Sequence, residues 1–196
     1  MTLILQKEAS QVLSDERSKL RRPMYLSLLL IFLVMPLVLS VLQASEYGGT
    51  IDDTQLGFSA EIIKGHFSLM DTQGMMLFAL GNLFDCLFIL SYGTFFYNST
   101  RYLSWNYRHG SIAKRIAVAF TWIGVTSATC DAIENAFLFL MLSNPLGFPS
   151  WLAIAHSLFA TLKFLMMYAT IGWLILSVVL NKTFFRNQVE NEGRIT

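Results

Sequence analysis

Ionisable side chains are scarce in this sequence, and cysteine, histidine and proline are scarcer still. Only 14% of the 196 residues are charged, and the chain contains two cysteines, three histidines and four prolines. Both cysteines fall inside apolar stretches, which is a poor basis for a disulfide framework or a zinc knuckle. The formal net charge of only +1 gives no indication of nucleic acid as a partner.

Hydrophobic residues are in surplus. They make up 54% of the chain, and the mean hydropathy of +0.51 exceeds what a soluble core needs. Charges are nearly absent from four long stretches, at about 24–42, 75–96, 116–142 and 151–180. Each stretch is close to the 20 or so residues that a helix needs to cross about 30 Å of hydrocarbon, and none alternates like a barrel strand. The sequence predicts an all-α integral membrane protein, a four-transmembrane-helix bundle forming one domain over 1–196.

Lysine and arginine are unevenly divided among the segments outside these stretches. Five precede the first stretch, four lie between the second and third, three follow the fourth, and only Lys64 lies between the first and second. Because positively charged loops are retained in the cytoplasm, we expect an N-in/C-in protein with cytoplasmic tails at 1–22 and 183–196 and an external loop at 43–74. A short helix on the membrane surface is expected in that loop from Leu56, Ile63 and Phe67.

Five titratable side chains nevertheless lie deep in the apolar stretches. A charge near the bilayer centre costs at least about 2.5 to 3.5 kcal/mol, so such residues usually face the bundle interior and have a partner. Counted at about 1.5 Å per residue from the outer ends of the stretches, three of the helices bring opposite charges to a similar depth. The five side chains are Asp85, Asp131, Glu134, His156 and Lys163.

Helical spacing predicts that these residues share an inward face. Asp131, Glu134 and Asn135 follow a stripe of small and polar residues at intervals of three or four along the third stretch. Asn82 precedes Asp85 by three residues and shares its face. The predicted binding site for a ligand or a proton therefore comprises Asp85, Asp131, Glu134, Lys163, His156, Asn135 and Asn82.

The charges in this site do not balance. With every acid ionised and His156 neutral, three carboxylates and one lysine would leave a charge of minus two. Burial and mutual repulsion then favour a proton on at least one carboxyl. We expect a non-enzymatic protein that binds or moves a proton, a cation or a small amphipathic ligand. Asp131 and Glu134 would be the titrating pair, with Asp85 and Lys163 as their electrostatic partners.

Two other functions stay open. One is an intramembrane enzyme that acts on a lipid-soluble substrate by carboxyl acid and base chemistry. A metal-dependent version is less favoured because Asp-x-x-Glu is not the Glu-x-x-His pair of di-iron bundles, so we expect no metal and no other cofactor. The other is an accessory subunit in which Lys163 pairs with Asp85 or Asp131 and the polar cluster only holds the helices together.

The expected partners follow from these alternatives. They are the lipid bilayer, a small amphipathic or cationic ligand, and either further copies of the chain in a homo-oligomer or the subunits of a larger membrane complex. Because the loops are short, the membrane we expect is the plasma membrane of a prokaryote.

Overall fold

The fold is entirely helical over the residues that the structure describes. The computed structural model describes residues 2–107 and 110–192, with side chains over 15–50, 53–107 and 110–181. Its helices are α1 (Thr2–Ala44), α2 (Ile51–Leu56), α3 (Ala60–Ser68), α4 (Thr72–Ser104), α5 (Ile112–Leu142) and α6 (Ser150–Glu192).

Four of these helices are long and apolar enough to cross a membrane. The qualifying segments are Asp15–Ala44, Thr72–Ser104, Ile112–Leu142 and Ser150–Asn181, with hydropathies of 2.6, 1.7, 1.5 and 1.9. This confirms the predicted all-helical fold and indicates a membrane protein. The helices extend beyond the predicted stretches because polar residues at their ends continue the same helical backbone. Residue 1 and residues 193–196 of the two predicted tails lie outside the described residues.

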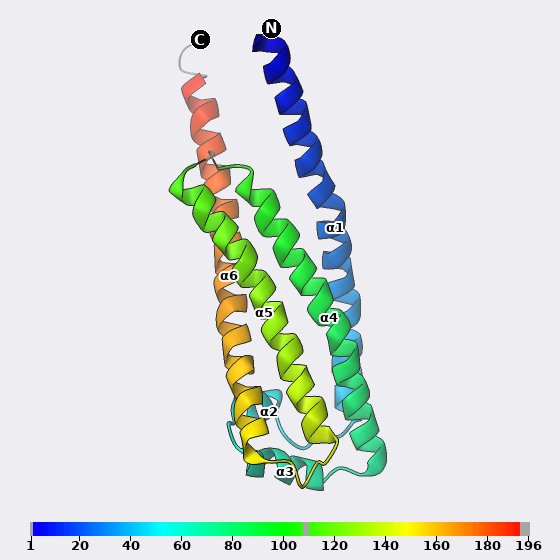
Figure 1. Ribbon diagram of the computed structural model, residues 1–196. Coiled ribbons are helices and arrows are strands. Elements are labelled where there is room, and N and C mark those ends of the chain that lie inside the picture. The colour runs from blue at the N-terminus through cyan, green and yellow to red at the C-terminus, as the bar shows by residue number, and fades with distance from the viewer. Residues whose placement is uncertain (1, 108–109, 193–196) are drawn as a thin grey trace.

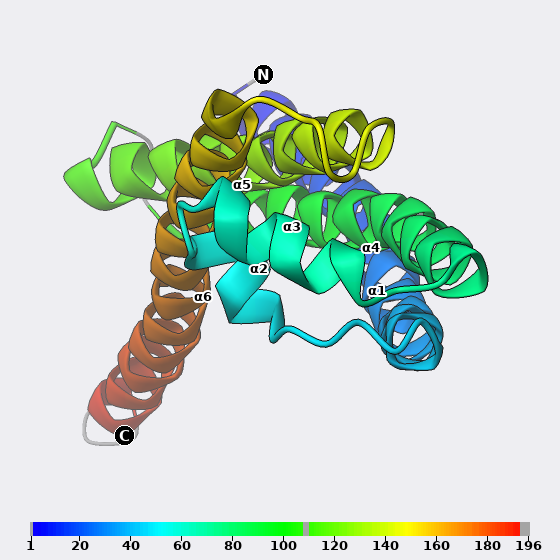
Figure 2. The ribbon, with the colours of Figure 1, turned by 90° about the horizontal axis from the view of Figure 1, so that it is seen from below.

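The long helices pack in chain order. In Figure 1, α1 packs along α4, α4 packs against α5, and α5 packs against α6. The described ends of α1 and α6 that are nearest the termini lie at the same end of the bundle as the connection between α4 and α5. Figure 2 shows α2 and α3 lying across the opposite end. We call these the terminal end and the capped end.

Each of the two short helices begins at a capping residue. Thr50 and Asp53 form a capping box at the start of α2, with the Asp53 amide donating to Thr50 Oγ1 at 3.0 Å and the Thr50 amide donating to Asp53 Oδ2 at 3.2 Å. Hydrogen bonds to Thr50 place the pKa of the Asp53 carboxyl below its ordinary value. Ser59 accepts from the Ile62 amide and caps α3 in the same way.

The apolar face of α3 is buried against protein. Ile63 is fully buried, and Phe67 is only 3% exposed. Both belong to a core cluster with residues at the capped ends of α4, α5 and α6, such as Phe78 and Met141. The residues from which one short helix was predicted lie on two helices. Leu56 ends α2 and is 42% exposed, whereas Ile63 and Phe67 of α3 are buried and close the end of the bundle.

Small residues allow the long helices to approach closely, and Gly124 is the one that contacts two neighbouring helices. A Cβ added at Gly124 of α5 would lie 2.8 Å from the Phe96 Cβ of α4 and 3.2 Å from the Thr170 Cγ2 of α6. Glycine therefore lets α5 contact both neighbours, as tight helix packing in membranes requires. This packing brings the polar faces of α4, α5 and α6 together.

Candidate functional site

Lys163 of α6 lies between two carboxyl groups of α5. Its Nζ is 2.7 Å from Asp131 Oδ1 and 2.6 Å from Glu134 Oε2. All three side chains are at most 7% exposed. The two acids stand three residues apart on α5 and so project from one face of that helix. One ammonium group therefore bridges two carboxylates in an interior from which water is largely excluded.

Tyr92 of α4 extends this arrangement to a third helix. Its hydroxyl donates a hydrogen bond of 2.8 Å to Asp131 Oδ2, so both oxygens of that carboxyl have a partner. Ser127 Oγ of α5 donates to the Lys163 carbonyl at 2.9 Å and so joins α5 to the α6 backbone. The Tyr92 hydrogen bond holds the Asp131 carboxyl, and the Ser127 hydrogen bond holds the backbone of Lys163.

His156 continues the contacts toward the capped end. Its Nε2 lies 3.5 Å from Glu134 Oε1, and both side chains are 1% exposed. The next residue, Ser157, accepts a hydrogen bond of 3.1 Å from the Phe58 amide, which lies between α2 and α3. A series of contacts therefore runs through the bundle interior and ends at His156, one residue from this junction of the short helices. We call its members the buried polar chain: Tyr92, Asp131, Lys163, Glu134 and His156.

Asp85 of α4 forms a side branch of this chain. Its Oδ2 accepts a hydrogen bond of 2.8 Å from Asn135 Nδ2 of α5, and Asp131 and Lys163 are near enough to act on it electrostatically. The amide carries no charge to offset the Asp85 carboxylate. Lys163 thus makes its direct ion pairs with Asp131 and Glu134, while Asp85 has an amide partner.

The structure brings six of the seven predicted site residues into this network and separates one from it. The exception is Asn82, whose Nδ2 donates to the Phe78 carbonyl of its own helix at 2.8 Å. Within residues 53–107 and 110–181, Asn82 makes no hydrogen bond to any of the acids. Tyr92, by contrast, is a member of the network that the sequence did not predict. Its place seven residues after Asp85, two turns along α4, is the signal that could have identified it.

The donor set does not form a metal site among the described side chains. No group of three or more His, Cys, Asp or Glu residues there is placed to hold a metal ion. Lys163 occupies the position between the carboxyls of Asp131 and Glu134. Cys86 and Cys130 are free thiols that form no disulfide.

The buried polar chain is suited to holding protons and to passing them between side chains in contact.

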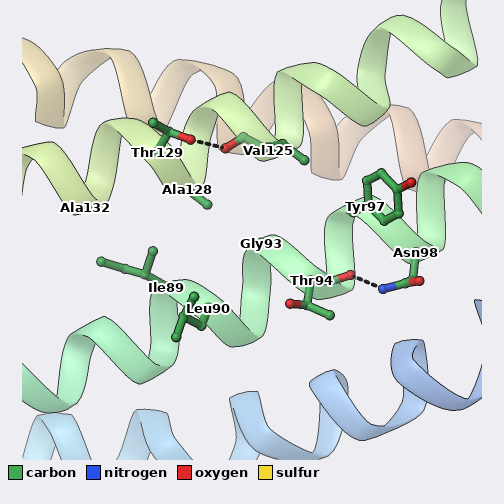
Figure 3. A pocket seen from close by; sticks show the side chains of 10 residues that line it. All are labelled: Ile89, Leu90, Gly93, Thr94, Tyr97, Asn98, Val125, Ala128, Thr129 and Ala132. Atoms are coloured by element: carbon green, nitrogen blue, oxygen red, sulfur yellow. Dashed lines mark hydrogen bonds between the residues drawn. The ribbon is translucent and has the colours of Figure 1, made fainter.

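A lateral groove lies between α4 and α5, apart from the network. Its volume is about 440 Å³, and none of its lining residues belongs to the buried polar chain. In Figure 3, Ile89 and Leu90 of α4 lie across the groove from Ala128 of α5. The dashed lines in Figure 3 show polar groups of the lining bonded within their own helices, including Asn98 Nδ2 to the Thr94 carbonyl. The groove is an apolar space without an acid or a base in its wall.

The fold and the network together define a helical bundle with four helices long and apolar enough to cross a membrane and with ionisable groups paired inside it. Comparison with protein-family models, with curated proteins and with solved structures finds no match to this chain.

Proposed function

We propose that this protein binds protons within the membrane, in the network formed by the buried polar chain and Asp85. The observation that carries the proposal is that Asp131 and Glu134 share one lysine, while Asp85 accepts a hydrogen bond from an uncharged amide. With every acid ionised and His156 neutral, three carboxylates and one ammonium leave the network a net charge of minus two. Because uncompensated charge in hydrocarbon is costly, proton binding is the simplest way to lower that cost.

A proton suits the network better than a larger ligand does. The side chains already contact one another at 2.6 to 2.8 Å around Lys163, and the groove of Figure 3 is lined by other residues. A proton needs no cavity, since it moves between groups in hydrogen-bond contact. The entrance we propose is His156, which contacts Glu134 and is followed in the chain by Ser157, the hydrogen-bond partner of the Phe58 amide between the short helices.

The distribution of basic residues supports a side of the membrane for this entrance. The end of α4 and the start of α5, which meet at the terminal end, carry Arg101 and Lys114, and Arg17 and Arg21 of α1 contact Tyr102 there. Helix α3, at the capped end, carries Lys64. By the rule that basic segments stay in the cytoplasm, the terminal end is cytoplasmic and His156 faces the external side. A prokaryotic plasma membrane, where a proton gradient is maintained, is the membrane we propose. A reporter enzyme fused to the C-terminus, active only in the cytoplasm, tests the orientation.

The first test of proton binding is infrared difference spectroscopy of the purified protein during a pH change. We expect a carboxylic acid C=O band that titrates in the wild type and is lost or shifted in Glu134→Gln. The matched control is Glu61→Gln, which makes the same chemical change at an exposed position on α3. An identical band in the wild type, Glu134→Gln, Asp131→Asn and Asp85→Asn would overturn the proposal.

The second test asks whether the bound proton moves. The protein is reconstituted into vesicles that contain a pH-sensitive dye, and internal pH is followed after an external acid pulse with potassium and valinomycin present to dissipate the membrane potential. We expect faster acidification than in empty vesicles, and slower acidification with His156→Phe than with wild type. Titration of the band without acidification would limit the function to proton binding.

A structural role is the second candidate, and the two ion pairs of Lys163 favour it. The ion pairs join α5 to α6, and the Tyr92 hydrogen bond joins α4 to α5. An accessory subunit of a larger complex could use the same contacts only to hold its helices together. For that role, no carboxyl band titrates near neutral pH, and the variants lose stability without any change in proton uptake.

A further inference from the structure

The terminal end carries a group of cations around one tyrosine. The guanidinium carbon of Arg17 lies 4.4 Å from the centre of the Tyr102 ring, and that of Arg21 lies 5.4 Å from it. Arg21 Nε donates to the Tyr102 hydroxyl at 3.2 Å, and Arg17 Nη2 donates to Asn106 Oδ1 at 2.7 Å. The two arginines are four residues apart on α1 and so present one face to α4.

These cations have no carboxylate partner among the described side chains. Within residues 15–50, 53–107 and 110–181, neither Arg17, Arg21, Arg101 nor Lys114 forms an ion pair, and the nearby Glu16 is paired with Lys19. The Nε atoms of Arg17 and Arg101 are buried and have no hydrogen-bond acceptor among the described residues. A buried guanidinium N–H without an acceptor is costly, and an anion would supply one.

Tyr102 also lines an apolar groove between α1, α4 and α6. The groove has a volume of about 470 Å³, within the range of sites for small molecules. We call it the Tyr102 groove. Its wall includes Met24, Phe95, Tyr102, Leu174, Ile175 and Val178.

We propose that the Tyr102 groove and the arginines at its rim form a binding site for an anionic phospholipid. An acyl chain would lie in the groove, and the phosphate would lie near Arg17 and Arg21. Charge complementarity selects this occupant, because an apolar groove beside unpaired cations matches a molecule with an apolar chain and an anionic head. Basic pockets between helices at the cytoplasmic face of membranes bind such headgroups in general.

The first experiment measures lipid binding to the full chain in detergent by native mass spectrometry. The probes are phosphatidylglycerol and phosphatidylcholine with identical acyl chains. We expect selective retention of phosphatidylglycerol. In Arg17→Gln/Arg21→Gln we expect its dissociation constant to rise about thirtyfold, which corresponds to about 1 kcal/mol for each cation. Equal retention of the two lipids would overturn the proposal.

A matched control separates this site from general attraction to basic residues. Lys19→Gln/Arg22→Gln removes two charges from the same turns of α1 at exposed positions. We expect this variant to bind phosphatidylglycerol as the wild type does. An equal loss of binding in both double variants would show diffuse electrostatic attraction and would overturn a defined site.

A second pair of variants tests the acyl-chain groove without changing charge. Val178→Trp fills the groove from a position that is 42% exposed, and Leu176→Trp adds the same side chain to α6 outside it. We expect weaker phosphatidylglycerol binding in Val178→Trp alone. Full displacement of the lipid by glycerol phosphate would show that the site takes a free phosphate. Dimers that form in place of lipid binding would show that a second copy fills the groove. Either result overturns the lipid assignment.

Discussion

Replacing Lys163 by methionine is the sharpest test of the network, because the change keeps most of the side-chain volume and removes only the charge. At an effective dielectric constant of about 20 and a charge separation of about 4 Å, each of its two ion pairs contributes about 4 kcal/mol of attraction before the cost of desolvation. The contacts at 2.7 and 2.6 Å to side chains at most 7% exposed place both pairs out of reach of strong solvent screening. Removal of one partner from a buried pair typically costs about 3 to 5 kcal/mol, since the remaining charge is left uncompensated.

The assay is thermal unfolding in a mild detergent. For a chain of this size, about 3 to 5 kcal/mol corresponds to a fall in Tm of about 6 to 20 °C. The matched control is Lys64→Met, which removes a lysine that lies 4.8 Å from the Phe148 ring and forms no ion pair with the described residues. We expect a much smaller change in Tm for that variant.

The pH dependence of the Lys163→Met variant follows from charge. Once the lysine is gone, acidification neutralises the carboxylates of Asp131 and Glu134, so the Tm deficit relative to wild type should shrink as the pH falls. Adding Asp131→Asn and Glu134→Gln to Lys163→Met should likewise restore much of the stability. If Lys163→Met unfolds within a degree or two of wild type, the lysine is not a buried partner of both acids, and this account of the network is wrong.

Three further outcomes are expected. Tyr92→Phe removes the hydrogen bond to Asp131 and should cost about 1.5 to 3 kcal/mol, measured as a fall in Tm; an unchanged Tm would contradict that contact. Gly124→Ala should cost about 1 to 3 kcal/mol through overpacking, whereas Gly172→Ala, where an added Cβ meets nothing within 4 Å, should be neutral or stabilising. The pKa of Asp53 is lowered in the folded state, so its contribution to stability is present above the unfolded-state pKa and is lost as the pH falls through the folded-state pKa. Carbon-13 NMR titration should give a folded-state pKa below the ordinary pKa of an aspartate. An ordinary pKa would contradict the capping box.

The helices were predictable because the signal for each lay within one stretch of sequence. Four long apolar runs with few charges determine four long helices, whatever their packing. The identity of most polar residues in the network was predictable for a related reason, since an acid or a lysine in an apolar helix must find a partner inside the bundle. Asp131, Glu134 and Lys163 are the strongest examples.

The pairing within the network was not predictable, because it depends on the rotation and depth of three helices relative to one another. Sequence spacing placed Asp85 and Asp131 at nearly equal depth beside Lys163, yet Lys163 contacts Asp131 and Glu134, and Asp85 bonds to Asn135. Asn82 shares a helical face with Asp85 but bonds to its own backbone, which is a common choice for a buried amide.

The place of α1 at the margin of the bundle has a consequence for biosynthesis. Its packing partner, α4, follows it in the chain, so α1 is synthesised before the helix it packs against. Its hydropathy of 2.6, against 1.5 for α5, suits a helix that must first be stable with lipid on every side. The acids of α4 and α5 then arrive before Lys163 of α6. The ion pairs of Asp131 and Glu134 can therefore form only after the last long helix has been synthesised.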